Sequence, residues 1–329
     1  MEKTLDQKLA ILRKQRDADE FIICYAADPD IAAGVIPISE SFPSLSVYYE
    51  HLEALVKQQK LDILLTSNST MDELARARGL FEKSPVTPAI RANDATDNWH
   101  VRGSQYEVSM SNGFSSTTLE EAMYGTLTPV ENQKVDVDLG LYSVTFNNDT
   151  ESDLRSLEAF KAFRIDATKK GFRYFIEVFN PNNPIGLSPE QIPDFVNDCV
   201  ARMLAGISRP SQPAFIKMQY NGARAMQELV SYTNAVVGIL GGSPSTTYDA
   251  FKLLADARAN GARVALFGRR IKVTEDPLAF VTMLREIADG NVSAEEAVKA
   301  YHGELQKAGI KPRRSLEDDM VLVTPELMD

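Results

Sequence analysis

The feature that most constrains this chain is an alternation of short apolar runs with longer segments of helical spacing. The runs are rich in branched and aromatic residues, which is typical of parallel strands buried on both faces. Parallel strands need a crossover between them, so the intervening segments are expected to be helical. We predict strands at FIICYAA (21–27), DILLT (62–66), TPAIRA (87–92), DLGLYSVTF (138–146), YFIEVF (174–179), AFIKMQ (214–219), AVVGILG (235–241) and RVALFG (263–268).

The segments between these runs carry helix start and stop signals. Ser188 to Gln191 is a capping box with a proline at the first helical position, and Gly206 is a suitable stop after the apolar stripe that follows. A second helix should run from Thr150 to Gly171. Further helices are predicted at about 47–59, 70–80, 117–124, 222–232, 245–261, 276–288 and 294–308, with an amphipathic helix before the first strand.

Eight strands alternating with eight helices predict an α/β fold of the (β/α)8 TIM-barrel type. An open doubly wound sheet is the competing fold, but the first strand leads into AADPDIAAG rather than into a GxGxxG turn. We expect one TIM-barrel domain over 1–329, with an N-terminal helix in 1–20, an insertion at 94–116 and a C-terminal helical extension at 291–329. The alternating QYEVSM within the insertion suggests a short hairpin, and the insertion either covers the site or is decorative.

Composition excludes several classes of function. Lys plus Arg is 35 and Asp plus Glu is 46, so the formal charge is −11, which argues against a nucleic-acid partner. No apolar run is long enough for a membrane span, and the charged N-terminus does not resemble a signal peptide. The two cysteines, Cys24 and Cys199, stand in apolar runs and form no disulfide framework, so we expect a cytoplasmic protein.

The histidines predict no metal site. His51, His100 and His302 are far apart in sequence and form no HExxH or HxH pattern. A catalytic zinc site usually needs two or three histidines placed together. The chemistry is therefore expected to use organic side chains.

Two charged residues stand inside apolar strands. Lys217 lies in AFIKMQ, and a lysine is seldom buried without a partner or a function. Desolvation makes the neutral amine available, and a neutral amine attacks carbonyls to form a Schiff base. Glu177 lies in YFIEVF on the preceding strand, so both side chains should reach the same barrel mouth. Glu177 could move protons beside an iminium, or the two could form a structural ion pair.

Other polar residues follow the strand ends, which form the catalytic face of a barrel. Asp28 closes the first strand and is a further candidate carboxylate, although Asp-Pro-Asp also suits a turn. Glycines and an arginine follow the seventh and eighth strands, where barrels often bind phosphate, and two tight turns are the plainer reading. This candidate phosphate site comprises Gly241, Gly242, Ser243, Gly268 and Arg269. Arg91 and Asn147, at the ends of the third and fourth strands, could bind substrate hydroxyls or serve turns.

The chain resembles the class I (Schiff-base) aldolase superfamily, including tagatose-bisphosphate, deoxyribose-phosphate and archaeal-type fructose-bisphosphate aldolases. The resemblance runs from about Asp28 to Ile271 and rests on four segments. These are DLGLYSVTFNNDT, RYFIEVF, FIKMQ and ILGGSPSTTYDAFKLLADARANGARVALFGRRI. The tagatose-type enzymes have a lysine on the fourth strand, where this chain has Ser143 and Thr145.

The resemblance implies a lyase of carbohydrate metabolism that needs no metal and no cofactor beyond a covalent lysine Schiff base. It implies that Lys217 is the Schiff-base lysine, Glu177 the proton-transfer residue and Asp28 a substrate-hydroxyl or relay carboxylate. Gly242 and Arg269 would hold a phosphate. The implied partner is a small phosphorylated sugar or keto substrate, and barrel aldolases are often homo-oligomers. Another Schiff-base lyase, a thiolase-like enzyme or an inactive phosphosugar-binding barrel remain alternatives.

Overall fold

The computed structural model describes residues 1–35, 41–242 and 245–328. Among these, eight parallel strands close into a barrel in chain order, with β10 pairing β1. The predicted TIM barrel and its strands are confirmed. The strands are β1 (Ile22–Ala27), β2 (Ile63–Thr66), β3 (Thr87–Arg91), β6 (Leu139–Thr145), β7 (Arg173–Phe179), β8 (Ile216–Met218), β9 (Val237–Leu240) and β10 (Val264–Phe267).

Each strand divides its side chains between two cores, because successive residues point to opposite faces. In β7, Ile176 and Val178 belong to the large core between the strands and the helices. Phe175 belongs instead to a smaller core inside the barrel, where it stacks on Phe215, the residue before β8. This alternation decides which side chains can line the mouth of the barrel, because only the residues that point into the barrel lie above its inner core.

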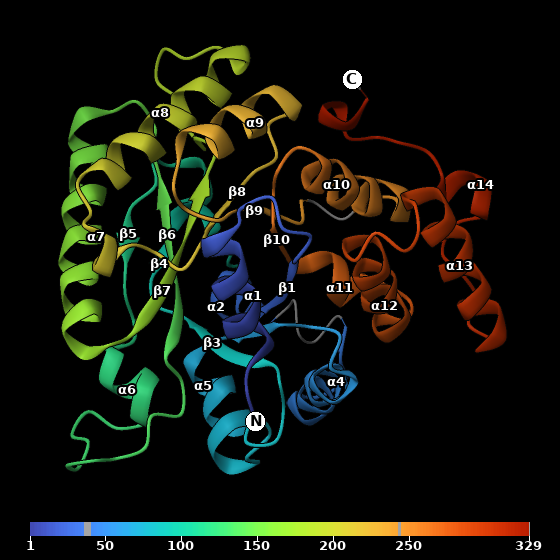
Figure 1. Cartoon of the computed structure of the whole chain (residues 1–329), viewed down its shortest axis with the longest axis horizontal. Coiled ribbons are helices and arrows are strands. Elements are labelled where there is room, and N and C mark those ends of the chain that lie inside the picture. The colour runs from blue at the N-terminus through green and yellow to red at the C-terminus, as the bar shows by residue number, and fades with distance from the viewer. Residues whose placement is uncertain (36–40, 243–244, 329) are drawn as a thin grey trace.

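Helices surround the strands, with α4, α7, α8, α9, α10 and α12 in the outer ring (Figure 1). The longest, α7, begins after Asp149, whose side chain accepts a hydrogen bond from the backbone N–H of Ser152. It ends at Gly171, which has a left-handed backbone conformation. The helices are α1 (Thr4–Lys14), α2 (Pro29–Ala33), α4 (Leu45–Gln58), α5 (Asn68–Met71), α6 (Leu119–Tyr124), α7 (Thr150–Lys170), α8 (Ile192–Ala205), α9 (Ala223–Tyr232), α10 (Thr247–Ala259), α11 (Arg269–Val273), α12 (Pro277–Ala288), α13 (Ala294–Lys307) and α14 (Leu316–Asp319).

The N-terminal helix α1 packs on the inner core of the barrel. Leu5, Leu9 and Leu12 are buried in the same cluster as the inward residues of the strands. Next to them, Lys8 pairs with Asp62 at 2.9 Å. Asp62 also accepts a hydrogen bond from Arg285 at 2.7 Å. The amino ends of the strands are therefore covered, and the opposite mouth is left for a site.

Two sequence predictions differ in detail from the structure. The hairpin expected at QYEVSM is wrong, since Tyr106–Val108 forms a 3-10 turn. Its backbone carbonyls are used otherwise, because Asn182 donates to two carbonyls at Glu107 and Ser109. A hairpin does occur in the insertion, between β4 (Asp94–Ala95) and β5 (Gly113–Phe114). The helix expected at 70–80 is α5 followed by a π-helical segment, Asp72–Ala77.

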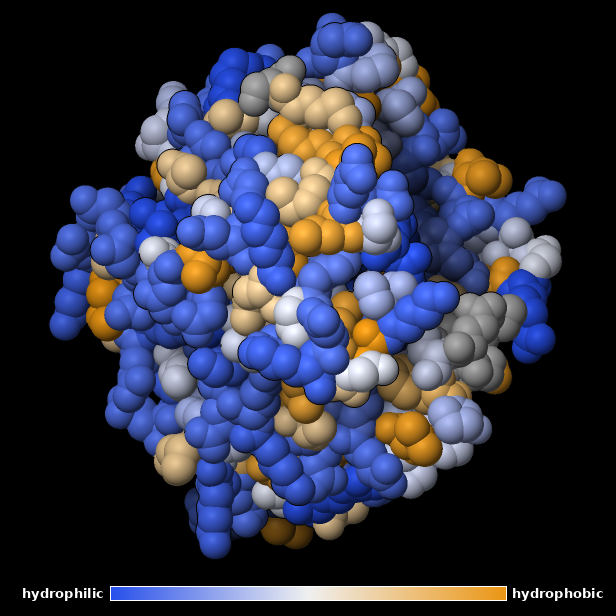
Figure 2. Space-filling model, turned by 90° about the vertical axis from the view of Figure 1, so that its right-hand side faces the viewer, coloured by the Kyte–Doolittle hydropathy of each residue, from blue (hydrophilic) through white to orange (hydrophobic). Residues whose placement is uncertain are grey.

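The C-terminal extension packs against the outside of the barrel. Helix α13 opens with the predicted capping box of Ser293 and Glu296 and contacts α10 and α12. Its apolar residues face inward, and the surface that carries the extension is mostly hydrophilic with separate hydrophobic areas (Figure 2). Among the described residues, no helix combines the length and the hydropathy that a membrane crossing requires.

Candidate active site

A charged layer lies on the inner core of the barrel, at the carboxyl ends of the strands. Glu177 faces Lys217 in the register of β7 and β8, and Ser143 faces Glu177 in that of β6 and β7. All three follow the inward parity of their strands, as does Arg91 at the end of β3. The same alternation carries Asp28 inward just after β1. Strand register and alternation thus place polar residues from separate strands next to one another in one cluster.

The layer is held by direct contacts. Lys217 Nζ forms an ion pair with Glu177 Oε1. Ser143 Oγ donates to Glu177 Oε2 at 3.0 Å and accepts from Arg91 Nη1 at 2.8 Å. Arg91 Nη2 lies 3.4 Å from Glu177 Oε2, and Arg91 Nε pairs with Asp28. Arg91 therefore bridges the two carboxylates, and the four charges sum to zero.

Burial and pairing act in opposite directions on Arg91. Burial alone would lower the pKa of its guanidinium, but the charges of Asp28 and Glu177 outweigh burial and raise that pKa above its usual value. Lys217 and Glu177 are 5% and 2% exposed, so both lie almost wholly out of water. Buried charges are tolerated only when they are paired, and each charge here has a partner.

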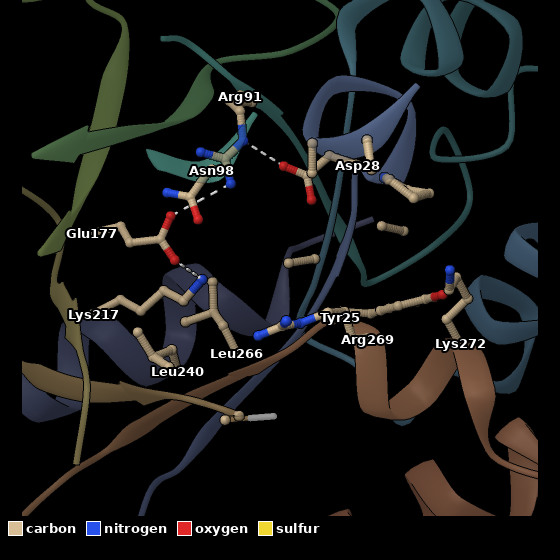
Figure 3. Close-up of a pocket in the computed structure, with 18 of the residues that line it drawn as sticks. Tyr25, Asp28, Arg91, Asn98, Glu177, Lys217, Leu240, Leu266, Arg269 and Lys272 are labelled. Carbon is tan, nitrogen blue, oxygen red and sulfur yellow. Dashed lines mark hydrogen bonds and ion pairs between the residues drawn. The ribbon is translucent and has the colours of Figure 1, made fainter. Parts of the chain in front are cut away.

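The charged layer forms part of the wall of a cavity of about 450 Å³ (Figure 3). The far side is built by the segments after β9 and β10, with Gly241, Gly242, Gly268 and Arg269. In Figure 3, Arg91 and Asp28 lie on one side of the cavity, and Arg269 lies on the other with Lys272. A carbonyl bound between these sides could reach the amine of Lys217, while an anionic end met the two cations.

The glycines of this wall have structural reasons of their own. A Cβ at Gly241 would collide with the ring of Phe267, so the chain passes close to β10 there. Gly242 has a φ of +66°, a conformation that side-chain-bearing residues rarely adopt. Because neither residue carries a side chain, an anion could approach the backbone N–H groups of this cavity wall.

Most of the predicted site residues line this one cavity. Ser243 lies outside the described residues. Asn147 is fully buried, and its Oδ1 accepts from the backbone N–H of Asn183 at 3.0 Å, so it braces the loop after β7. The residues brought together are Asp28, Arg91, Glu177, Lys217, Gly241, Gly242, Gly268 and Arg269.

Several lining residues were missed from the sequence. Tyr25 lies within a strand that reads as wholly buried, and Lys272 lies one helical turn after Arg269. Asn98 and His100 come from the insertion, whose length at the catalytic face was the only signal. Within the described part of the chain, no group of three or more His, Cys, Asp or Glu side chains is arranged to hold a metal ion.

No protein-family model matches this sequence. No curated protein matches it either.

Solved structures do match it. An archaeal fructose 1,6-bisphosphate aldolase superposes with a TM-score of 0.64 at 17% identity, over 87% of this chain and 100% of that one. A Schiff base-forming fructose-1,6-bisphosphate aldolase gives 0.61 at 18% identity, over the same shares. The fructose-bisphosphate aldolase of Slackia heliotrinireducens gives 0.66 at 13% identity, over 92% and 96%. At the level of the fold, this chain thus resembles class I fructose-bisphosphate aldolases of the archaeal type.

Proposed function

We propose that this chain is a metal-independent Schiff-base aldolase that acts on a phosphorylated sugar or keto substrate. The observation that carries the proposal is Lys217, a lysine buried at the carboxyl end of a barrel strand, with its amine at a cavity and beside Glu177. A lysine in such a place is suited to covalent catalysis on a carbonyl carbon. The fold shared with Schiff base-forming aldolases supports this reading of the residue.

The contact between Glu177 and Lys217 supplies the first proton transfers. Transfer of a proton from Lys217 Nζ to Glu177 leaves a neutral amine, whose lone pair forms a bond to the substrate carbonyl carbon. The C=O electron pair moves to oxygen, which takes one proton from the nitrogen to give the hydroxyl of the carbinolamine. Glu177 then returns its proton to that hydroxyl, which leaves as water, and the nitrogen lone pair forms the C=N bond of the iminium. Ser143 and Arg91 fix the other oxygen of Glu177, so the carboxyl group stays aimed at the amine.

The iminium then acts as the electron sink for the carbon–carbon bond. In cleavage, the bonding pair moves into the iminium and forms an enamine, while the departing fragment leaves as an aldehyde. Condensation is the reverse. Arg269 and the backbone N–H groups near Gly241 and Gly242 are proposed to bind the phosphate of the donor. This binding energy would orient the reacting carbons.

Borohydride trapping tests this proposal. The protein is incubated separately with dihydroxyacetone phosphate, pyruvate and ketose phosphates, reduced, and mapped by mass spectrometry. We expect a substrate-dependent adduct on the peptide that contains Lys217, absent from Lys217→Ala and unaffected in a Lys311→Ala control at an exposed lysine. The mass of the adduct names the donor.

Two results would count against the aldolase. An adduct that forms equally on Lys217→Ala would show nonspecific amine chemistry. Thermal stabilisation by a phosphorylated sugar without any adduct would instead favour a binding barrel that has no turnover.

A further inference from the structure

The insertion at 94–116 is built into the cavity and is not a free appendage. Asn98 and His100 line the cavity beside the strand residues. The backbone N–H of His100 donates to the carbonyl of Ala32 in α2 at 2.7 Å. Asp97 accepts from Thr145 at the end of β6 at 2.7 Å and from Ser111 at the same distance. The segment is thus anchored to the barrel on both sides of the residues that reach the cavity.

Asn98 offers a hydrogen-bond donor that nothing in the described residues accepts. Its Nδ2 is buried and has no partner in the described part of the chain. Buried amide donors are nearly always paired, so an orphan at a cavity is suited to a ligand oxygen. In Figure 3, Asn98 lies on the same side of the cavity as Arg91 and Glu177.

His100 is arranged as a proton acceptor. Its Nδ1 contacts the carboxylate of Glu107. A carboxylate on one ring nitrogen holds that nitrogen in its N–H form and leaves Nε2 with a lone pair. Asn182, in the loop after β7, holds the backbone of Glu107 in place with a hydrogen bond of 2.9 Å to its carbonyl.

The two carboxylates at the cavity are already held in ion pairs. Asp28 is paired with Arg91, and Glu177 is paired with both Arg91 and Lys217. His100 is also the one histidine among the described residues that line this cavity. A base is needed for the hydroxyl on the carbon that becomes the aldehyde, and the ring of His100 contacts a carboxylate rather than a cation.

We propose that the insertion supplies the acceptor end of the active site, an inference that rests on the proposed aldolase function. Asn98 Nδ2 binds the oxygen of the acceptor fragment, and His100 Nε2 takes the hydroxyl proton during cleavage. The O–H bond breaks, its electron pair forms the aldehyde C=O, and the carbon–carbon bonding pair passes to the iminium on Lys217. In condensation, the protonated His100 returns the proton to the new alkoxide.

The same surroundings define the class of acceptor. Pro29, Ala32 and Ala33 line the cavity as small apolar walls, and the carboxylate of Glu107 stands behind His100. The lining cations Arg269 and Lys272 belong to the segment after β10 instead, and Arg91 is held by Asp28 and Glu177. A carboxylate repels a phosphate, so this end suits a short uncharged hydroxyaldehyde. The substrate would then carry its phosphate on the donor half.

Kinetics of three variants test the proposal. His100→Gln should lower kcat for cleavage by about 10²–10⁴-fold, the usual contribution of a general base. The same variant should still trap the donor on Lys217 with borohydride. Glu107→Gln, a positioning change, should lower kcat by a smaller factor with KM unchanged, and Asn98→Ala should raise KM for glyceraldehyde in condensation. Glu131→Gln, at an exposed glutamate outside the cavity lining, is the matched control.

Binding of the acceptor can be followed without turnover. Trp99 is the single tryptophan of the chain and stands between Asn98 and His100, so its fluorescence should change when glyceraldehyde binds. The change should persist in Lys217→Ala and be lost in Asn98→Ala.

The outcomes separate the two proposals. If the donor is trapped but His100→Gln cleaves at the wild-type rate across pH, the role of the insertion is wrong and the aldolase stands. If nothing is trapped, the aldolase fails. If glyceraldehyde leaves the fluorescence of the wild-type protein unchanged, the acceptor site is overturned whatever the trapping result.

Discussion

Arg91→Met should reveal how far the charged layer depends on a single cation. Methionine keeps much of the length of the side chain but removes the charge and the donors. It would leave Asp28 without its guanidinium partner and Glu177 with only Lys217 and Ser143. Both carboxylates are at most 7% exposed, so hydration compensates only a small part of the lost contacts.

The expected loss of stability is large. Removing one member of a buried ion pair costs about 3–5 kcal/mol, because the remaining charge stays buried without compensation. Burial by itself would lower the pKa of Arg91, but Asp28 and Glu177 raise it, so the guanidinium stays charged throughout the neutral range. Its stabilisation is complete below the ordinary arginine pKa and is lost only at higher pH.

An exposed pair of the same type is the control. Arg155 contacts Glu151 at 2.9 Å in α7, but their side chains are 58% and 87% exposed. Such pairs contribute about 0.3–0.5 kcal/mol, so Arg155→Met should change stability roughly tenfold less. Arg91→Lys, which keeps the charge but loses the planar fork, should fall between the two.

Urea unfolding followed by circular dichroism provides the comparison, provided the dependence of the unfolding free energy on urea keeps its slope. If Arg91→Met and Arg155→Met lowered the unfolding free energy equally, the electrostatic coupling described here would be refuted.

Three further variants test the fold. Burial lowers the pKa of His51 to about 4, so the stabilisation from its neutral form is present above about pH 6.5 and lost as the pH falls toward 4. The loss is up to about 3 kcal/mol, and His51→Gln should flatten the acid side of a stability-versus-pH curve. A Cβ at Gly238 would lie 2.6 Å from the carbonyl oxygen of Val264, so Gly238→Ala should cost about 1–3 kcal/mol in thermal unfolding. Gly303→Ala, where a Cβ meets nothing within 4 Å inside α13, should instead stabilise by about 0.5–1 kcal/mol.

The barrel could be predicted because its strands and helices carry strong local signals. Strand β7, for example, is a run of apolar residues with one interruption at Glu177, and no other regular element fits such a run between two capped helices. The segment after β3 carries no such signal. Its aromatic residues Trp99 and Tyr106 stack on each other with ring centroids 4.6 Å apart, a contact between residues whose alternation alone favoured strands.

The site residues that could be placed from the sequence lie within strands or at their ends. Lys217, Glu177 and Arg91 were found because strand parity fixes where a side chain points. Asn147 has the same parity as Ser143, but it lies beyond the last residue of β6, where the chain leaves the strand direction. There its side chain binds the neighbouring loop, whereas Asp28, one residue past the end of β1, lines the cavity. A position just past a strand end therefore does not by itself decide where a side chain points.

The neutrality of the charged layer also bears on how a buried lysine could act as a nucleophile. Asp28, Arg91, Glu177 and Lys217 together carry no net charge. Moving the proton from Lys217 to Glu177 keeps that sum at zero, so no uncompensated charge appears in the interior. Without Arg91, Asp28 would be a buried anion without its guanidinium partner before and after that transfer, and its negative charge would favour keeping the proton on Lys217. A cation that never touches the substrate carbonyl would thus decide whether the amine can be freed, and Arg91→Met should lose Schiff-base trapping even where the protein remains folded.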